Sequence, residues 1–233
     1  MAACALAAGS REAEYLEAIQ PYGRDDLSQL SRAFALLVEE AESKPFEDVL
    51  GPYYIEIASH SCKQARGEFY TPQELSRAMA KMLVDIDRVR SDGTPITVCD
   101  PCCGSGGMIL ALAQEFAPGS VDLIRATCQD INPVAADMCY INTSLWGIPA
   151  TVILGDSLRM TTRGAWRNIH WVRVGEEQRQ AIEMMKDLIA SPPPTQPSDR
   201  AQPDVPTDQH GSKESDGQFE FDLNFCEAEE ICR

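Results

Sequence analysis

Apolar residues recur at every third or fourth position along the first part of the chain, which is the period of an amphipathic helix. This pattern runs through residues 11–65, where Asp25 and Asp26 are placed to cap a helix. The pair Gly51-Pro52 interrupts the pattern, so we expect the second helical stretch to be broken there. The pattern predicts a helical N-terminal extension over residues 1–66.

Further along, short apolar runs alternate with helical patterns, and three of these runs end in aspartate. ITVCD ends at Asp100, DLIRATCQD ends at Asp130 and TVILGD ends at Asp156. The alternation predicts parallel strands joined by helices. Because the carboxyl ends of parallel strands lie at one edge of a sheet, we expect the three carboxylates to line that edge. A single aspartate at a strand end is common, but three in succession indicate a ligand site.

A glycine-rich turn, DPCCGSGG, connects the first of these runs to the helical pattern MILALAQEF. Gly104, Gly106 and Gly107 allow a sharp turn and a close approach of the backbone to a ligand, because they have no β-carbon. A strand, a glycine turn and a helix in this order are typical of a nucleotide-type cofactor site. By its distance from the turn, Asp130 suits the two hydroxyls of a ribose, and Asp156 suits the exocyclic amine of an adenine.

Four segments of the chain resemble the S-adenosylmethionine-binding half of adenine-specific DNA methyltransferases, above all the modification subunits of type I restriction systems. They are GEFYTPQELSRAMAKML, VCDPCCGSGGMILALA, CQDINPVAADMCYINTSLWG and LGDSL, within about residues 45–158. The resemblance implies a Rossmann-like class I methyltransferase fold of three α/β/α layers, complete or truncated, with S-adenosylmethionine as cofactor. On this basis we divide the chain into a helical extension (1–66), a cofactor-binding domain (67–190) and a disordered acidic tail (191–233).

The same resemblance implies which residues bind the cofactor. Those at the methionine end would be Glu68, Phe69, Tyr70, Thr71, Pro72 and Gln73. Those around its carboxylate and amine would be Asp100, Gly104, Ser105, Gly106 and Gly107. Asp130 would hold the ribose, and Asp156 would hold the adenine.

One motif of the family is missing. Family members carry Asn or Asp, then Pro-Pro and an aromatic residue, at the end of the fourth strand, where these residues accept hydrogens from the target amine and stack on the flipped base. The best fourth-strand candidate is Asn168 to Val174, and Gly175, Glu176 and Glu177 follow it. The consecutive prolines occur only in SPPPT, which has no amide before them and no aromatic ring after them. The catalytic residues are therefore unassigned.

These observations leave three functions open. The leading one is DNA adenine methylation by a chain that works with a partner for DNA recognition. The second is an inactive S-adenosylmethionine-binding protein that acts as a regulator, decoy or partner subunit. The third is methylation of a substrate other than DNA.

The charge of the chain bears on its partners. The net charge is −16, and a protein that grips DNA alone normally presents a basic stripe. The richest basic stretch is modest and is interleaved with Trp166 and Trp171, and it consists of Arg159, Arg163, Arg167 and Arg173. It could line a nucleic-acid edge, with a tryptophan as the stacking face for the base, or it could be an ordinary loop with buried tryptophans. We expect DNA to be bound mainly through a partner protein such as a specificity subunit.

The tail from Ser191 is rich in proline, charge and small polar residues, which predicts disorder. Near its end, the segment Phe219–Phe225 reads FEFDLNF, with an apolar residue at every second position. This alternation favours an extended strand with one apolar face, which would dock in a groove or on a sheet edge. The segment loosely resembles bacterial peptides that bind the replication sliding clamp. A partner, or the chain's own domain, could receive it, and the N-terminal helices are a second candidate docking element.

The remaining sequence features favour a cytoplasmic protein without metal. No apolar stretch is long enough to span a membrane, and the N-terminus has no basic residue ahead of its short apolar run. Cys99 and Cys102 have a zinc-type spacing, but no second pair completes a site. We therefore expect no metal, no membrane and no disulfide.

Overall fold

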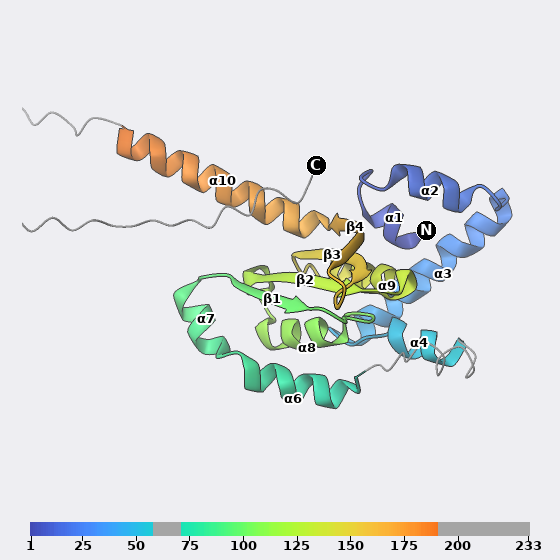
Figure 1. Cartoon of the computed structure of the whole chain (residues 1–233), viewed down its shortest axis with the longest axis horizontal. Helices are drawn as coiled ribbons and strands as arrows, with labels where there is room; N and C mark the ends of the chain where they lie inside the picture. The colour runs from blue at the N-terminus through green and yellow to red at the C-terminus, as the bar shows by residue number, and fades with distance from the viewer. Residues whose placement is uncertain (58–70, 191–233) are drawn as a thin grey trace, which may run out of the picture. The chain divides into compact units, whose positions relative to one another are not determined.

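The computed structural model describes residues 1–57 and 71–190, with side chains up to residue 180 (Figure 1). Its N-terminal part is helical, as expected. The helices are α1 (Ala2–Leu6), α2 (Glu12–Ile19), α3 (Arg24–Ser43) and α4 (Leu50–Ile57). Asp26 caps α3 by accepting a hydrogen bond from the Gly23 N–H at 3.0 Å. The expectation that Gly51-Pro52 breaks a helix is wrong, because this pair lies in the first turn of α4, where proline costs no hydrogen bond.

The three predicted strands form one parallel sheet. Its strands are β1 (Ile96–Asp100), β2 (Ile124–Asp130) and β3 (Ala150–Asp156), and β4 (Thr161–Arg167) adds to β3 in the antiparallel direction. The spatial order β1-β2-β3-β4 follows the chain. Helices α6 (Gln73–Leu83) and α7 (Ile86–Asp92) precede β1. Helix α8 (Gly107–Phe116) and the 3-10 turn η1 (Val121–Leu123) connect β1 to β2, and α9 (Pro133–Leu145) connects β2 to β3. Helix α10 (Ile169–Ala190) follows β4.

Helices α8 and α9 cover one face of this sheet. Alternate residues of β2, namely Ile124, Ala126 and Cys128, are fully buried, and they share one core with Phe116 of α8 and Tyr140 of α9. The residues between them in β2 are only half-buried, and the corresponding positions of β1, Thr97 and Cys99, are exposed. The period-2 alternation of the strand sequences therefore reflects a sheet with one strongly buried face.

The predicted strand over Asn168–Val174 is wrong. These residues begin α10, and the fourth strand lies earlier, at Thr161–Arg167. The cause is the side chain of Asn168, which is fully buried and accepts hydrogen bonds from the N–H groups of Trp171 (3.0 Å) and Ala150 (3.2 Å). This side chain caps α10 and fixes the start of the helix to β3. The actual strand β4 is mostly exposed, so its sequence carries little hydrophobic signal.

Arg11 ties the N-terminal helices to the rest of the fold. Its side chain is only 5% exposed and forms ion pairs with Glu14 at 2.6 Å and with Asp137 of α9 at 2.8 Å. Its guanidinium carbon lies 4.1 Å from the ring centroid of Trp166 in β4. The indole N–H of Trp166 donates to Glu14 at 3.2 Å. Trp166 is thus engaged by the extension, and its ring face against Arg11 is not open to a base.

Arg11 and Glu14 change each other's pKa in this cluster. The hydrogen bond from Arg11 lowers the pKa of Glu14 below its ordinary value, against a smaller opposing effect of burial. Burial by itself would lower the pKa of Arg11, but the hydrogen bonds to Glu14 and Asp137 outweigh it and raise that pKa. Both groups therefore stay charged at neutral pH.

We predict that Arg11→Met lowers the free energy of unfolding by about 2–3 kcal/mol, because it leaves Asp137 and Glu14 without their cation. The estimate lies below that for a fully buried pair because both carboxylates are partly exposed. Urea unfolding followed by circular dichroism measures the change. Arg88→Met is the matched control, since Arg88 pairs with Asp92 on an exposed surface and should change stability by less than about 0.5 kcal/mol.

The Arg11 effect should also depend on pH. Since the folded pKa of Glu14 is lowered, its charge contributes stability above the ordinary glutamate pKa of about 4.3 and loses that contribution as pH falls through the folded value. The difference between wild type and Arg11→Met should therefore shrink below pH 4. A difference that stays constant down to pH 3 would contradict this account of the cluster.

Candidate functional site

The structure brings together the three aspartates that end the parallel strands. Asp100 pairs in register with Cys128 of β2, two residues before Asp130, and Asp130 pairs with Leu154 of β3, two residues before Asp156. The three carboxylates therefore lie at the carboxyl edge of the sheet, as predicted. Burial raises the pKa of Asp100, and the hydrogen bond from the Cys102 N–H partly offsets this rise.

Each carboxylate also shapes the loop that follows its strand. Asp100 accepts a hydrogen bond from the Cys102 N–H at 3.2 Å, and Asp156 accepts two, at 3.0 Å each, from the N–H groups of Leu158 and Arg159. Asp130 contacts both the loop that follows its own strand and the glycine loop. One of its oxygens accepts from the Asn132 N–H at 2.8 Å, and the other accepts from the Gly104 N–H at 2.9 Å. Asp130 therefore holds the glycine loop as well as offering acceptors to a ligand.

At Gly106 the loop requires glycine because of its backbone conformation and because α9 lies close to it. Gly106 has φ 88°, and a β-carbon built on it would lie 3.0 Å from the sulfur of Cys139 in α9. Any side chain there would be strained and would collide with the helix. The missing side chain of Gly106 thus makes room for Cys139 of α9. Gly107 is different, because a β-carbon on it would meet only Asp48, at 3.8 Å.

Asp48 is a residue of the site that the sequence reasoning missed. It lies just before α4, and its carboxylate accepts hydrogen bonds from the Ser105 hydroxyl, from the Gly51 N–H (3.0 Å) and from the Asn142 amide (3.0 Å). The same Asn142 amide donates to the Ser105 carbonyl at 2.8 Å. Ser105 and Asn142 are both buried. This network joins the N-terminal extension, the glycine loop and α9. An aspartate three residues before a glycine at a helix start is a recognisable cap signal, but nothing local indicates its distant partners.

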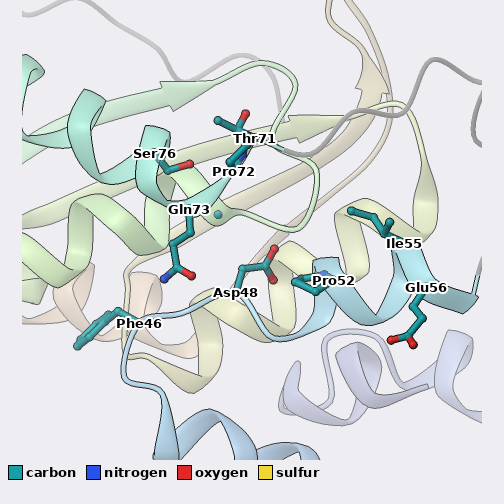
Figure 2. A pocket seen from close by; sticks show the side chains of 10 residues that line it. Phe46, Asp48, Pro52, Ile55, Glu56, Thr71, Pro72, Gln73 and Ser76 are labelled. Atoms are coloured by element: carbon teal, nitrogen blue, oxygen red, sulfur yellow. The ribbon is translucent and has the colours of Figure 1, made fainter.

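A pocket of about 340 Å³ lies beside this network, between α4 and α6 (Figure 2). Its volume is in the range of sites for small organic ligands. Figure 2 shows Asp48 and Gln73 facing the same space, with Phe46 at one end and Glu56 towards the other. The lining residues are Phe46, Asp48, Pro52, Ile55, Glu56, Thr71, Pro72, Gln73, Ser76 and Gly107. Four of them, Thr71, Pro72, Gln73 and Gly107, were predicted to contact the cofactor.

One polar group in the pocket wall has no partner within the described structure. Ser76 is 1% exposed, and its hydroxyl makes no hydrogen bond there. A buried hydroxyl left unpaired costs about 1–3 kcal/mol, so this group favours a ligand or water that pairs with it.

The predicted residues thus fall into two groups on either side of the glycine loop. Asp100, Asp130 and Asp156 lie at the strand ends and do not line the pocket. The loop joins the two groups, because Gly104 is bonded to Asp130 and Gly107 lines the pocket. Glu68, Phe69 and Tyr70 lie outside the described residues.

The basic stretch is largely occupied by contacts within the chain. Arg159 pairs with Asp156 at 3.7 Å, Arg163 donates to the Ile131 carbonyl, and Arg173 pairs with Glu177 at 3.9 Å. These contacts favour the interpretation of the stretch as ordinary surface structure over that of a nucleic-acid edge.

The cysteines near the loop do not converge on a metal. Cys99 and Cys102 are exposed, whereas Cys103 turns inward towards the buried thiols of Cys128 and Cys139. Hydrogen bonds from the neighbouring thiols, together with burial, raise the pKa of Cys139 and keep it protonated. Among the side chains that the structure describes, in residues 1–57 and 71–180, no group of His, Cys, Asp and Glu is arranged to hold a metal ion. Within the same ranges no helix is long and apolar enough to cross a membrane.

Comparison with known proteins places this site in a family. Residues 46–211 match the family model described as N-6 DNA Methylase, and this range contains the pocket, the glycine loop and all three strand-end aspartates. The chain belongs to the N-6 DNA methylase family. Its fold is accordingly the class I methyltransferase fold, of which the described residues show the helices and a mixed four-stranded sheet.

The curated relatives of this chain include methylase subunits of type I restriction enzymes and a type II methyltransferase. The chain is 25% identical over 152 residues to the type I restriction enzyme MpnII methylase subunit of Mycoplasma pneumoniae, which covers 63% of this chain and 25% of that protein. It is 31% identical over 97 residues to the type II methyltransferase M.VspI of a Vibrio species, covering 41% and 22%. It is 25% identical over 142 residues to the MjaIX methylase subunit of Methanocaldococcus jannaschii, covering 59% and 24%. The matched part spans about a quarter of the length of these relatives.

We predict that Asp48→Ala lowers the free energy of unfolding of this chain by about 2–4 kcal/mol, because it leaves buried groups of Ser105 and Asn142 without their acceptor. Hydrogen exchange at the Gly104–Gly107 amides should accelerate in parallel. Asp25→Ala is the matched control, since Asp25 is exposed in the first turn of α3 and should change stability by less than about 0.5 kcal/mol. Equal unfolding midpoints for the two variants would show that the network does not hold the loop.

Proposed function

We propose that this chain binds S-adenosylmethionine and forms the cofactor-binding part of a DNA methyltransferase that modifies the exocyclic amine of adenine. The observation that carries the proposal is the glycine loop, which stands between three strand-end carboxylates and an acidic pocket. The family match and the names of the relatives support the reaction class.

The residues present fit this cofactor. S-adenosylmethionine has an adenosine half with hydroxyls and an amine that donate hydrogen bonds, which suits the carboxylates of Asp130 and Asp156. Its methionine half contains an ammonium group and the sulfonium, and both cations suit the carboxylates of Asp48 and Glu56 in the pocket. The unpaired hydroxyl of Ser76 offers a hydrogen bond to a polar group of the ligand. Phe46 and Ile55 supply apolar wall.

The bound cofactor would supply an electrophilic methyl group, and the chain's own contribution is to hold it. A loop that is already fixed loses little conformational freedom when it binds the ligand. When a group is transferred between two bound reactants, holding them in the right position accounts for a large part of catalysis. The Asp130–Gly104 and Asp48–Ser105 bonds fix this loop from two sides. No step of this scheme requires a metal.

The family's motif for binding the target base is missing from the sequence of this chain. The sequence has no Asn/Asp-Pro-Pro-aromatic tetrapeptide, and Trp166, one candidate stacking face, lies against Arg11. These observations favour a second candidate function, in which the chain binds the cofactor but needs another protein for catalysis or acts as an inactive regulatory subunit. Several relatives are named as methylase subunits, which supports a multi-protein setting.

DNA recognition would come from a partner. The net charge of −16 gives the chain few cations with which to displace the counterions of DNA, and several arginines are already paired. A specificity subunit or similar protein would then contribute the basic recognition surface. The N-terminal helices are candidate docking elements, since Leu16, Leu30 and Leu36 are exposed on them.

We predict that the chain binds S-adenosylmethionine with a Kd in the micromolar range, on the order of −8 kcal/mol, and that Asp130→Asn weakens binding by about 1–3 kcal/mol through loss of a charged acceptor. Isothermal titration calorimetry measures both values. Asp122→Asn is the matched control, because Asp122 is exposed at the opposite end of β2 and should leave the Kd unchanged. Absence of binding by the wild-type chain would refute the proposed function.

We predict that the isolated chain transfers no methyl group to duplex DNA and shows no gel shift at physiological salt, because it lacks both the base-binding motif and a basic surface. The assay uses radiolabelled cofactor followed by digestion of the DNA to nucleosides. Turnover by the lone chain would show that it contains a base pocket of another composition. In that case Trp171→Ala should reduce kcat far more than cofactor affinity if Trp171 provides the stacking face.

A further inference from the structure

Three buried thiols meet beside the glycine loop. Cys103 lies in the loop, Cys128 lies in β2 and Cys139 lies in α9. Hydrogen bonds link the Cys103 thiol to those of Cys128 and Cys139, and a further hydrogen bond links Cys128 to Cys139. All three are free thiols within one apolar core. They form a cluster of nucleophilic groups that the proposed cofactor site does not use.

The backbone of the loop lies close to the elements that carry the other two thiols. The Cys103 N–H donates to the carbonyl of Gln129 at 2.9 Å, and Gln129 directly follows Cys128 in β2. A β-carbon built on Gly106 would lie 3.0 Å from the sulfur of Cys139. Because Cys103 and Cys128 have adjoining backbones and thiols in contact, a disulfide between them requires little backbone movement.

Access to solvent distinguishes the three thiols. Cys128 and Cys139 are fully buried, whereas Cys103 is 6% exposed and follows the exposed Cys102. The hydrogen bond to Cys128 and burial raise the pKa of Cys103, so the closed loop keeps this thiol protonated and unreactive. Local opening of the loop removes both effects and makes Cys103 the first of the three that a small oxidant reaches.

Cys128 is suited to react second. Hydrogen bonds from Cys103 and Cys139 lower the pKa of Cys128, against the opposing effect of burial. A thiol that holds its proton less tightly supplies more of the thiolate, which is the form that attacks another sulfur. Cys139 has the opposite tendency, since hydrogen bonds from the other thiols and burial raise its pKa.

We propose that Cys103 and Cys128 form a peroxide-sensitive modification site that controls the glycine loop. In the first step the sulfur of Cys103 attacks one oxygen of hydrogen peroxide, the O–O bond breaks, and the released hydroxide leaves with the thiol proton as water. In the second step the sulfur of Cys128 attacks the sulfur of the resulting sulfenic acid, the S–O bond breaks, and a second water leaves with the Cys128 proton. The thiol pair is oxidised by two electrons, and the peroxide is reduced to water.

The disulfide changes the position of the loop. A covalent bond holds two sulfur atoms closer together than a hydrogen bond does, so its formation draws Cys103 towards β2. The next residue, Gly104, then loses the geometry in which its N–H bonds Asp130. We expect the oxidised loop to bind S-adenosylmethionine more weakly, and this part of the inference rests on the proposed function. A thiol reductant reverses the modification, because it returns both cysteines to thiols.

Peptide mapping by mass spectrometry under non-reducing conditions tests the disulfide on the full-length chain. After treatment with hydrogen peroxide, digestion with trypsin and an aspartate-directed protease should release two linked peptides that contain Cys103 and Cys128. Cys103→Ser should abolish this pair, whereas Cys99→Ser and Cys102→Ser change exposed thiols and should leave its yield unchanged. A bond from Cys103 to Cys139, or a Cys103 that remains unlinked, would overturn the proposal.

Calorimetry tests the effect on the loop. Oxidised and untreated chains, both freed of peroxide, are titrated with S-adenosylmethionine, and oxidation should raise the Kd at least about tenfold. Dithiothreitol should restore the original value. The same treatment should leave the Kd of Cys103→Ser unchanged, which controls for oxidation elsewhere in the chain. An equal Kd in the oxidised and untreated wild type would overturn the control of the loop.

A failure of the proposed function would look different. In that case the untreated chain would not bind S-adenosylmethionine at all, whatever the result of peptide mapping. Hydrogen exchange at the amides of Gly104–Gly107 would then measure the movement of the loop without a ligand, and equal rates in the oxidised and reduced chains would overturn the proposal.

Discussion

The glycine loop after β1 is held from two sides by carboxylates, and the candidate site depends on this arrangement. Asp130 binds the loop from the end of β2 through Gly104, and Asp48 binds it from the N-terminal extension through Ser105. The two bonds come from parts of the chain that lie 82 residues apart in sequence, so the loop acquires its shape only when the whole domain has folded. A loop fixed in this way loses little freedom when a ligand binds, and this preserves affinity.

The sheet side of this arrangement could be predicted from sequence, and the extension side could not. Alternating apolar residues and strand-end aspartates are local patterns, so the order of β1, β2 and β3 and the meeting of their carboxylates followed from them. The role of Asp48 depends on contacts with Ser105 and Asn142, which are far along the chain. The error over residues 168–174 has a similar cause. Apolar residues there suggested a strand, but the buried amide of Asn168 starts a helix, and the real strand β4 is too exposed to show a hydrophobic pattern.

Several basic residues of the fold, together with Trp166, are engaged in contacts within the chain. Arg11 uses its charge on Glu14, Asp137 and the ring of Trp166, and this cluster joins α2, α9 and β4. Arg159 and Arg173 have carboxylate partners on the same chain, and both pairs are exposed. The positive charges are thus used locally in a chain with a large excess of negative charge.

In the part of the chain that the structure describes, β1 has a paired neighbour on one side only, and the glycine loop follows directly from this strand. The glycine loop begins at Asp100, the last residue of a strand that has one described neighbour, so the position of the loop is supported by β2 on one side only. Any strand that pairs with β1 in the ligand-ready conformation stabilises that conformation by its own binding free energy. Thermodynamic linkage makes this effect reciprocal, so a ligand at the loop must strengthen pairing at the edge by the same factor by which pairing strengthens ligand binding.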